Sequence, residues 1–376
     1  MATFGDIAKG FDYGMNAAAK SFDGNNKYIR ITDIDEVSSQ YLYDDVVSPD
    51  GELEDSYLVK ENDILLARTG ASTGKSYLYR NSDGKLYFAG FLIRANIYKH
   101  NAYFVFSQLH TLRYKKWISV MSARSGQPGI NSQEYASFPV YTTSLQEEDK
   151  IATFLKLLDE RITTQNKIID RLESLIRGIN QYAFTSKGVN YKLGELCEIR
   201  SGYSGNQLTS KNGLKVSRIE TISGHKVNME RVGYVAPFES SGNYRLQIGD
   251  ILFSNINSVE YIGNTAFIDK DYNLYHGMNL LRLAPNKKVV MPFYLYLLLN
   301  TNRMLNHFKT VCNKAVSQAS INQTELGKTV IRIPDLKAQK QICELFQALY
   351  AKLESESYAI SLLQNQKQHL LRQMFI

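Results

Sequence analysis

Residues 151–183 read IATFLKLLDERITTQNKIIDRLESLIRGINQYA, and this stretch decides how the chain must fold. Its apolar side chains recur at alternating steps of four and three residues, the heptad spacing of a coiled-coil helix. The predicted pairing residues are Ile151, Leu155, Leu158, Ile162, Ile169 and Leu172, then Ile176, Ile179 and Ala183. Gln165 is a polar residue within this stripe. A stripe this narrow predicts a partner helix.

The C-terminal residues carry the same spacing. The pairing positions there are Ile342, Phe346, Leu349, Leu353, Ile360, Leu363, Leu370 and Met374, with Glu356 and Lys367 as polar members. A helix of about 35–40 residues would span roughly 55 Å. We expect the two helices to pair in antiparallel fashion, as a rigid rod with a globular domain at either end. The alternative is that each helix packs only on its own domain.

Five short segments of the first half of the chain recur in the second half, in the same order and at offsets of 187 to 191 residues. The pairs are ATFGDI at 2–7 with KLGEL at 192–196, YIRITDI at 28–34 with VSRIETI at 216–222, NDILL at 62–66 with GDILF at 249–253, LIR at 92–94 with LLR at 280–282, and GIN at 129–131 with SIN at 320–322. Repeats at a constant offset indicate an internal duplication.

Each copy contains short β-type runs, then one helix-like stretch (103–120 and 293–311), a loop and the long helix. The predicted fold is α+β, with two mixed α/β domains related by a pseudo-two-fold internal repeat. The predicted bounds are 1–145 and 187–336 for the two domains, and 146–186 and 337–376 for the two long helices.

The composition predicts a cytoplasmic protein without a membrane partner. No apolar run is long enough to cross a membrane, and the N-terminus lacks the apolar core of a signal peptide. The three cysteines have no C-x-x-C spacing, which predicts neither disulfides nor a zinc site. The net charge of +7 permits a polyanionic partner. Residues 1–145 have a net charge of −1 and residues 187–336 a net charge of +7, and acidic residues gather between Asp33 and Asp63.

One glycine-rich loop in each copy is a candidate for contact with DNA. The segment GASTGKS at 70–76 resembles a phosphate-binding P-loop, but it is one residue short, and the second copy has no Gly-Lys at all. We therefore expect a nucleic-acid contact or an ordinary strand–turn–strand connection rather than a nucleotide site. The candidate contacts are Arg68, Thr69, Lys75 and Ser76 in the first copy, and Asn255, Asn257, Ser258 and Asn264 in the second.

The loops that precede the long helices are the second candidates. They supply Arg124, Gln127 and Asn131 in the first copy, and Lys314, Gln318 and Asn322 in the second. Asn and Gln suit bidentate contacts with adenine, whereas Arg and Lys suit guanine or phosphate. Each Asn could equally cap a short following helix.

The architecture resembles the specificity subunit of type I restriction-modification systems. The resemblance rests on the near-exact duplication, the opening motif of each copy, the N/G-D-I-L-[LF] strand with its loop, and the segment IPDLKAQKQI at 333–342. The second copy keeps Pro334, Leu336 and Gln339 of the family pattern before the helix, whereas the first keeps only Leu145.

The resemblance implies a non-catalytic DNA-reading subunit whose target-recognition domains each read half of a split duplex site. Paired helices would set the distance between the halves and dock two DNA methyltransferase subunits, and restriction (translocase-nuclease) subunits could join the complex. This subunit would hold no cofactor, since S-adenosylmethionine, ATP and Mg²⁺ would be bound by the partners. Two rivals are a coiled-coil adaptor that binds proteins, and an enzyme that uses the loop at 70–76 for a nucleotide.

Overall fold

The computed structural model describes residues 1–123, 129–184, 188–314 and 318–375. The chain divides into two compact units. Unit 1 comprises Met1–Lys167 and Ser357–Ile376, and unit 2 comprises Ile168–Glu356. Each long helix therefore contributes one part to each unit.

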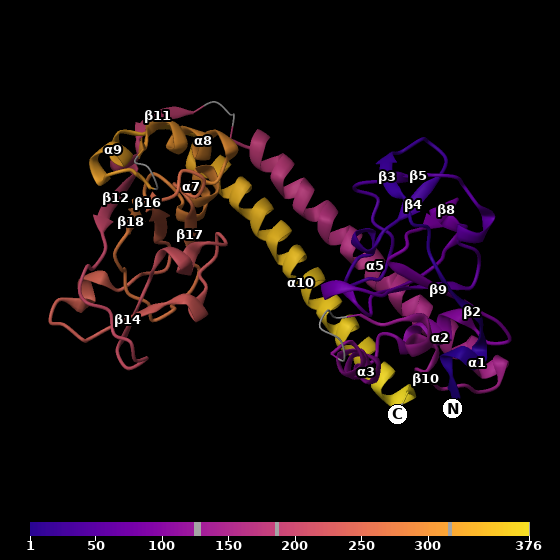
Figure 1. Ribbon diagram of the computed structural model, residues 1–376. Coiled ribbons are helices and arrows are strands. Elements are labelled where there is room, and N and C mark those ends of the chain that lie inside the picture. Colours follow the sequence, from indigo (N-terminus) through magenta and orange to yellow (C-terminus); the bar gives the residue numbers. More distant parts are fainter. Residues whose placement is uncertain (124–128, 185–187, 315–317, 376) are drawn as a thin grey trace. The chain divides into compact units, whose positions relative to one another are not determined.

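A four-stranded antiparallel sheet forms the centre of unit 1 (Figure 1). Its strand order is β2 (Ala8–Tyr13), β9 (Leu92–Ile97), β6 (Asp63–Ala67) and β7 (Ser76–Leu78). All five residues of β6 are buried, because Ile64 and Leu66 pack into one apolar cluster while Leu65 and Ala67 pack into another. The predicted segment NDILL is thus the central strand of a sheet that is buried on both faces.

Unit 2 repeats this sheet strand for strand, in the order β12 (Cys197–Ser201), β18 (Leu280–Pro285), β15 (Ile251–Ser254) and β17 (Thr265–Phe267). Strand β15 divides its side chains between two clusters in the same way as β6. The equivalent topology confirms the predicted duplication.

Short elements complete each unit. In unit 1 they are β1 (Ala2–Thr3), α1 (Phe4–Ile7), β3 (Ala18–Ser21), β4 (Lys27–Ile29), β5 (Val47–Asp50), β8 (Leu86–Phe88), α2 (Ala102–Gln108), α3 (Leu112–Ser122), α4 (Ser132–Ala136) and β10 (Pro139–Val140). In unit 2 they are β11 (Val189–Lys192), α6 (Leu193–Leu196), β13 (Leu214–Val216), β14 (Gly233–Val235), β16 (Ile256–Asn257), α7 (Pro292–Leu299), α8 (Asn302–Val311), β19 (Asn313–Lys314), β20 (Ala319–Ser320), α9 (Gln323–Lys328) and β21 (Val330–Ile333).

The single helix-like stretch predicted in each copy is wrong in one respect, because it forms two helices. Thr111 separates α2 from α3, and Thr301 separates α7 from α8. Each threonine hydroxyl accepts a hydrogen bond from the backbone N–H three residues later, at Tyr114 and Met304. Apolar periodicity continues across such a break, so the sequence pattern alone did not reveal these caps.

The long helices are α5 (Leu145–Tyr182) and α10 (Leu336–Met374), and they pair within each unit. In unit 1, Leu155 of α5 shares an apolar cluster with Leu371 and Phe375 from the end of the chain. Lys367 of α10, a predicted polar member of the stripe, lies 2.5 Å from the carboxylate of Asp159 in α5. The early part of α5 thus meets the late part of α10.

In unit 2 the late part of α5 meets the early part of α10, where Ile176 and Phe346 are buried in one cluster. The two helices are therefore antiparallel, as predicted. Every residue predicted to lie in either apolar stripe is buried or half-buried. Leu371 and Phe375 fall outside the predicted stripe. They are buried in the apolar core of unit 1, in the same cluster as Phe104 of α2.

One buried side chain near the start of each long helix ties it to its own globular domain. Gln339 accepts a hydrogen bond from the backbone N–H of Met291 and donates to the carbonyls of Val289 and Pro334. Glu148 stands at the equivalent position of α5. It accepts the backbone N–H of Asn101 at 2.9 Å and lies 2.8 Å from the ring of His100. The first copy therefore departs from the family pattern by having Glu148 in place of the glutamine, but the helix is still hydrogen-bonded to its own domain at this position.

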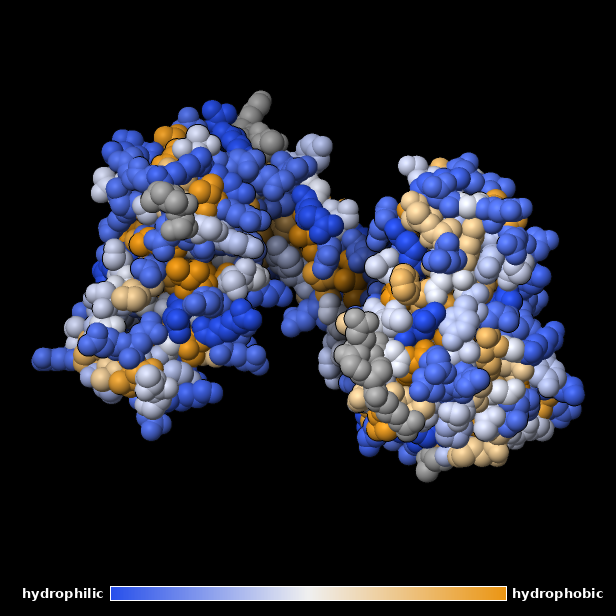
Figure 2. All heavy atoms as spheres, in the orientation of Figure 1, coloured by the Kyte–Doolittle hydropathy of each residue, from blue (hydrophilic) through white to orange (hydrophobic). Residues whose placement is uncertain are grey.

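The surface seen in Figure 2 is mainly hydrophilic, with smaller apolar patches between the polar side chains. Among the described residues, no helix has the length and apolar character needed to cross a membrane. The same part of the chain contains no group of three His, Cys, Asp or Glu side chains that could hold a metal ion.

Candidate nucleic-acid interface

The glycine-rich segment of unit 1 is a hairpin connection between β6 and β7. Gly70 and Gly74 both have positive φ angles, of 71° and 91°, which allow the tight reversal. The backbone N–H groups of Thr73, Gly74 and Lys75 donate to protein carbonyls at 3.0–3.1 Å. Because these donors are already used, they do not form the phosphate cradle of a P-loop. The segment is thus a strand–turn–strand connection rather than a P-loop, and its side chains stay candidates for contact with DNA.

The two candidate loops of each unit lie together. In unit 1 the backbone N–H of Ile130 donates to the carbonyl of Arg68 at 2.9 Å, and Thr69 forms a β-bridge with Gly129. In unit 2 the N–H of Ile321 donates to the carbonyl of Asn255, also at 2.9 Å, and β16 pairs with β20. Each unit therefore joins the two predicted loops, which are about 60 residues apart in sequence, into one polar surface.

In unit 1 the predicted contacts differ in accessibility. Asn131 is exposed, and Arg68, Thr69 and Lys75 are half-buried. Ser76 is buried within β7, so its hydroxyl does not belong to the surface, contrary to the expectation. Arg124 and Gln127 lie outside the described residues.

In unit 2 the predicted contacts Ser258, Lys314, Gln318 and Asn322 are exposed. Asn257 is half-buried, and its side-chain oxygen accepts the backbone N–H of Ser258. Asn264 is only 9% exposed, which removes it from the surface set.

Both loop asparagines act as helix caps. The side-chain oxygen of Asn131 accepts the N–H of Glu134 at 2.9 Å, at the start of α4. Asn322 accepts the N–H of Glu325 at 2.8 Å, at the start of α9. Their side-chain oxygens are thus engaged in capping, the alternative that the sequence left open.

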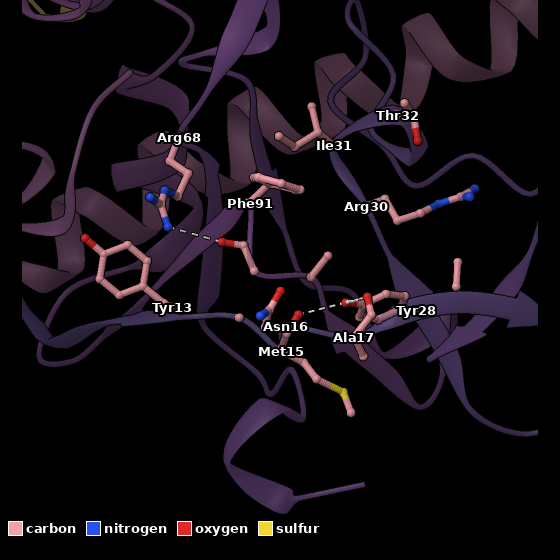
Figure 3. Close-up of a pocket in the computed structure, with 14 residues that line it drawn as sticks. Tyr13, Met15, Asn16, Ala17, Tyr28, Arg30, Ile31, Thr32, Arg68 and Phe91 are labelled. Carbon is pink, nitrogen blue, oxygen red and sulfur yellow. Dashed lines mark hydrogen bonds between the residues drawn. The ribbon is translucent and has the colours of Figure 1, made fainter. Parts of the chain in front are cut away.

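Aromatic residues that the sequence did not single out surround Arg68 (Figure 3). The Arg68 guanidinium lies 4.7 Å from the ring centroid of Tyr13 and donates to the carbonyl of Gly90 at 3.4 Å. The backbone N–H of Ser132 donates to the hydroxyl of Tyr13 at 3.2 Å, which joins this ring to the second loop. Phe91 lies beside them with 63% of its surface exposed.

These residues border a pocket of about 600 Å³, whose lining contains two arginines and no carboxylate. Figure 3 shows Arg68 turned towards Tyr13 on one side of the pocket and Arg30 extending on the other. Arg30 is neutralised, since Asp33 lies 2.7 Å and Asp45 2.9 Å from its guanidinium, and these carboxylates raise its pKa. Part of the acidic cluster predicted between Asp33 and Asp63 is thus engaged within the domain.

The register of the sheets explains why the sequence missed Tyr13 and Phe91. Strand pairing places Tyr13 opposite Ile93 and Ser201 opposite Leu281, so Tyr13 and Ser201 are equivalent. In the same register Phe91 corresponds to Asn279. The copies differ at both positions, so the repeat gave no signal there. The signal that remained was an aromatic residue directly before Gly14 at a strand end.

Two equivalent modules, each with a polar loop surface and each attached to one of two paired helices, define a duplicated recognition protein. The model of the type I restriction modification DNA specificity domain matches residues 4–174 and 186–363, one match for each copy. The chain belongs to this family.

Curated relatives are specificity subunits of type I restriction enzymes. The putative MjaX subunit of Methanocaldococcus jannaschii is 41% identical over 180 residues, which cover 47% of this chain and 42% of that protein. The EcoKI subunit of Escherichia coli is 25% identical over 295 residues, covering 71% and 60%, respectively. The chain thus spans less than two thirds of either relative. The crystal structure of the S subunit from M. genitalium shares the fold, with a TM-score of 0.64 and 14% identity over 100% of this chain and 95% of that one.

Proposed function

We propose that the chain is the DNA sequence-specificity subunit of a type I restriction-modification complex. Each unit reads one half of a bipartite duplex site. The observation that carries this proposal is the assembly of equivalent loops into one polar surface per unit, with different side chains in the two copies. A shared scaffold with divergent loops suits a protein that reads two different half-sites. The specificity role itself is non-catalytic.

The direct contacts in this proposal are Arg68, Thr69, Lys75, Asn255, Asn257, Ser258, Lys314, Gln318 and the exposed amides of Asn131 and Asn322. Chemistry on DNA belongs to partner subunits, two methyltransferases and, where present, translocase-nucleases, which would bind S-adenosylmethionine, ATP and Mg²⁺. We place this assembly in the cytoplasm.

An apolar groove on the paired helices of unit 2 supports the methyltransferase part of the proposal. The groove is lined by Leu175, Gly178, Ile179 and Tyr182 of α5 and by Leu345 of α10. Leu175 and Leu345 expose about half of their surfaces, 49% and 45%. Exposed apolar side chains that gather on one helix face mark a protein interface. Leu175→Glu with Leu345→Glu should reduce co-purification with the methyltransferase. The control Gln347→Glu with Ala351→Glu, at exposed positions of α10 that do not line the groove, should leave it unchanged.

Salt-dependent binding of duplex DNA tests the function. The chain assembled with its methyltransferase should bind one duplex sequence selectively, and the affinity should fall by orders of magnitude between about 50 and 200 mM salt. A coiled-coil adaptor, which the family match does not favour, would retain its protein partners and show no sequence-selective binding of DNA.

A further inference from the structure

The first residue after the central strand differs in chemistry between the two units. Arg68 follows β6, and Asn255 follows β15. Their carbonyls accept equivalent hydrogen bonds, from Ile130 and from Ile321, both at 2.9 Å. The backbone therefore holds the two side chains at the same place in the two loop surfaces.

The Arg68 guanidinium is held in place and keeps hydrogen-bond donors that a ligand can use. Stacking on Tyr13 and the bond to Gly90 use one face and one N–H of the guanidinium, so its other donors stay available. Within the described part of the chain, Arg68 has no carboxylate partner, unlike Arg30 and Arg94, which pair with Asp33 and Asp12. The absence of acidic residues from the pocket lining leaves the positive charge uncompensated there.

Asn255 occupies a different environment. Tyr13 and Phe91, the aromatic residues beside Arg68, correspond to Ser201 and Asn279 in unit 2. The cation–aromatic arrangement is therefore missing around Asn255. The side-chain oxygen of Asn255 is shielded from solvent and has no hydrogen-bond partner among the described residues. The residue as a whole is half-buried. To meet a base, the Asn255 amide must therefore rotate so that its oxygen, shielded in this structure, faces the loop surface. An unsatisfied amide oxygen at a surface loop requires an N–H donor from elsewhere.

We propose that Arg68 and Asn255 are the equivalent base-reading residues of the two units. Arg68 reads a guanine in one half of the site, and Asn255 reads an adenine in the other half. The guanidinium donates two hydrogen bonds to O6 and N7 of guanine, whereas the amide accepts from N6 and donates to N7 of adenine. The ring of Tyr13 positions the Arg68 guanidinium. This inference rests on the proposed function.

Selection from a randomised duplex pool tests the assignment, with the full chain bound to its methyltransferase and methylation as the readout. The wild-type motif should contain a guanine in one half and an adenine in the other. Arg68→Asn should change the preference at the guanine alone, by about tenfold or more. Asn255→Arg should change the adenine alone. Tyr13→Ala should weaken the preference for guanine, while Tyr13→Phe, which keeps the ring, should retain most of it.

Failure of the base-reading assignment and failure of the proposed function give different results in this experiment. If the wild-type complex selects no motif, the proposed function fails. If it selects a motif and Arg68→Asn weakens every sequence equally, Arg68 contacts phosphate and the inference is overturned. Arg68→Lys provides the matched variant, because it keeps the charge for a phosphate contact but loses the two-pronged geometry. A preference for guanine that survives in Arg68→Lys would also overturn the assignment.

Discussion

The ring of Phe375, just after α10, packs edge-on against Phe104 of α2 in unit 1, with the ring centroids 5.2 Å apart. Phe184, just after α5, stands at the equivalent position and packs on Tyr294 of α7 in unit 2, also at 5.2 Å. Each long helix therefore begins at the globular domain that precedes it and ends against the domain of the other copy. This reciprocal exchange makes each unit depend on both halves of the chain.

Truncation of Phe375 should destabilise unit 1 selectively. Phe375 is 4% exposed, and replacing such a phenylalanine by alanine costs about 3–5 kcal/mol. Hydrogen exchange should accelerate in Phe375→Ala within residues 1–167 and stay near the wild-type rate within 188–314. Tyr358→Ala, at an exposed position of the same helix, is the control. Equal acceleration in both units would contradict the anchoring role.

Removal of the Gln339 amide should weaken unit 2. In Gln339→Ala, the Met291 N–H and two carbonyls lose their partner in a buried site, and each such group costs on the order of 1–3 kcal/mol. The midpoint of urea unfolding, followed by far-ultraviolet circular dichroism, should fall. Gln341→Ala, two residues along on the exposed side of α10, should leave it unchanged. A similar loss in both variants would show that helix propensity dominates.

His276 should make the stability of unit 2 depend on pH. The ring is 1% exposed, and its Nε2–H donates to the carbonyl of Leu280 at 2.9 Å. Burial lowers the pKa of His276 to about 4, below the ordinary value near 6.5. The unfolded chain therefore takes up the proton first. The contribution of the neutral His276 ring to the free energy of unfolding is complete above pH 6.5. It is lost progressively as the pH falls towards 4, by about 3 kcal/mol at most.

Urea unfolding of His276→Gln, which keeps an N–H donor but does not titrate, measures how much the His276 ring contributes to the pH dependence of stability. The wild type should lose stability relative to this variant between pH 6.5 and 4. His369→Gln, at an exposed position of α10, should instead follow the wild type. Parallel curves for the wild type and His276→Gln would disprove the assignment.

Lengthening both helices should lengthen the gap between the half-sites, if the helices act as a spacer. One heptad inserted after Lys167 and one after Glu356 fall at the boundary between the units and spare the contacts within each. Seven residues add roughly 10 Å of helix, comparable to about three base pairs. Methylation mapping of the variant complex should show unchanged half-sites farther apart. An unchanged gap would exclude the spacer role.

The repeat and the heptads predicted the architecture because both depend on the pattern of apolar residues. Leu155 and Phe346 are buried where the spacing placed them. The site was less predictable, because it depends on pairing between distant segments. Residue type marked Ser76 and Asn264 as contacts, but strand β7 and the neighbouring core bury them. The stacking of Arg68 on Tyr13 depends on strand register, which no local motif encodes.

Replacement of residues 1–145 by a second copy of residues 187–336 tests the central claim most directly. The exchanged chain should also carry Glu148→Gln, because Gln339 both accepts from Met291 and donates to the carbonyls of Val289 and Pro334, which a carboxylate cannot do. Methylation mapping of the complex should then show a symmetrical site, in which the half formerly read by unit 2 occurs twice as an inverted repeat. The original asymmetric site, or a change in both halves, would contradict the account of two modules that each read one half.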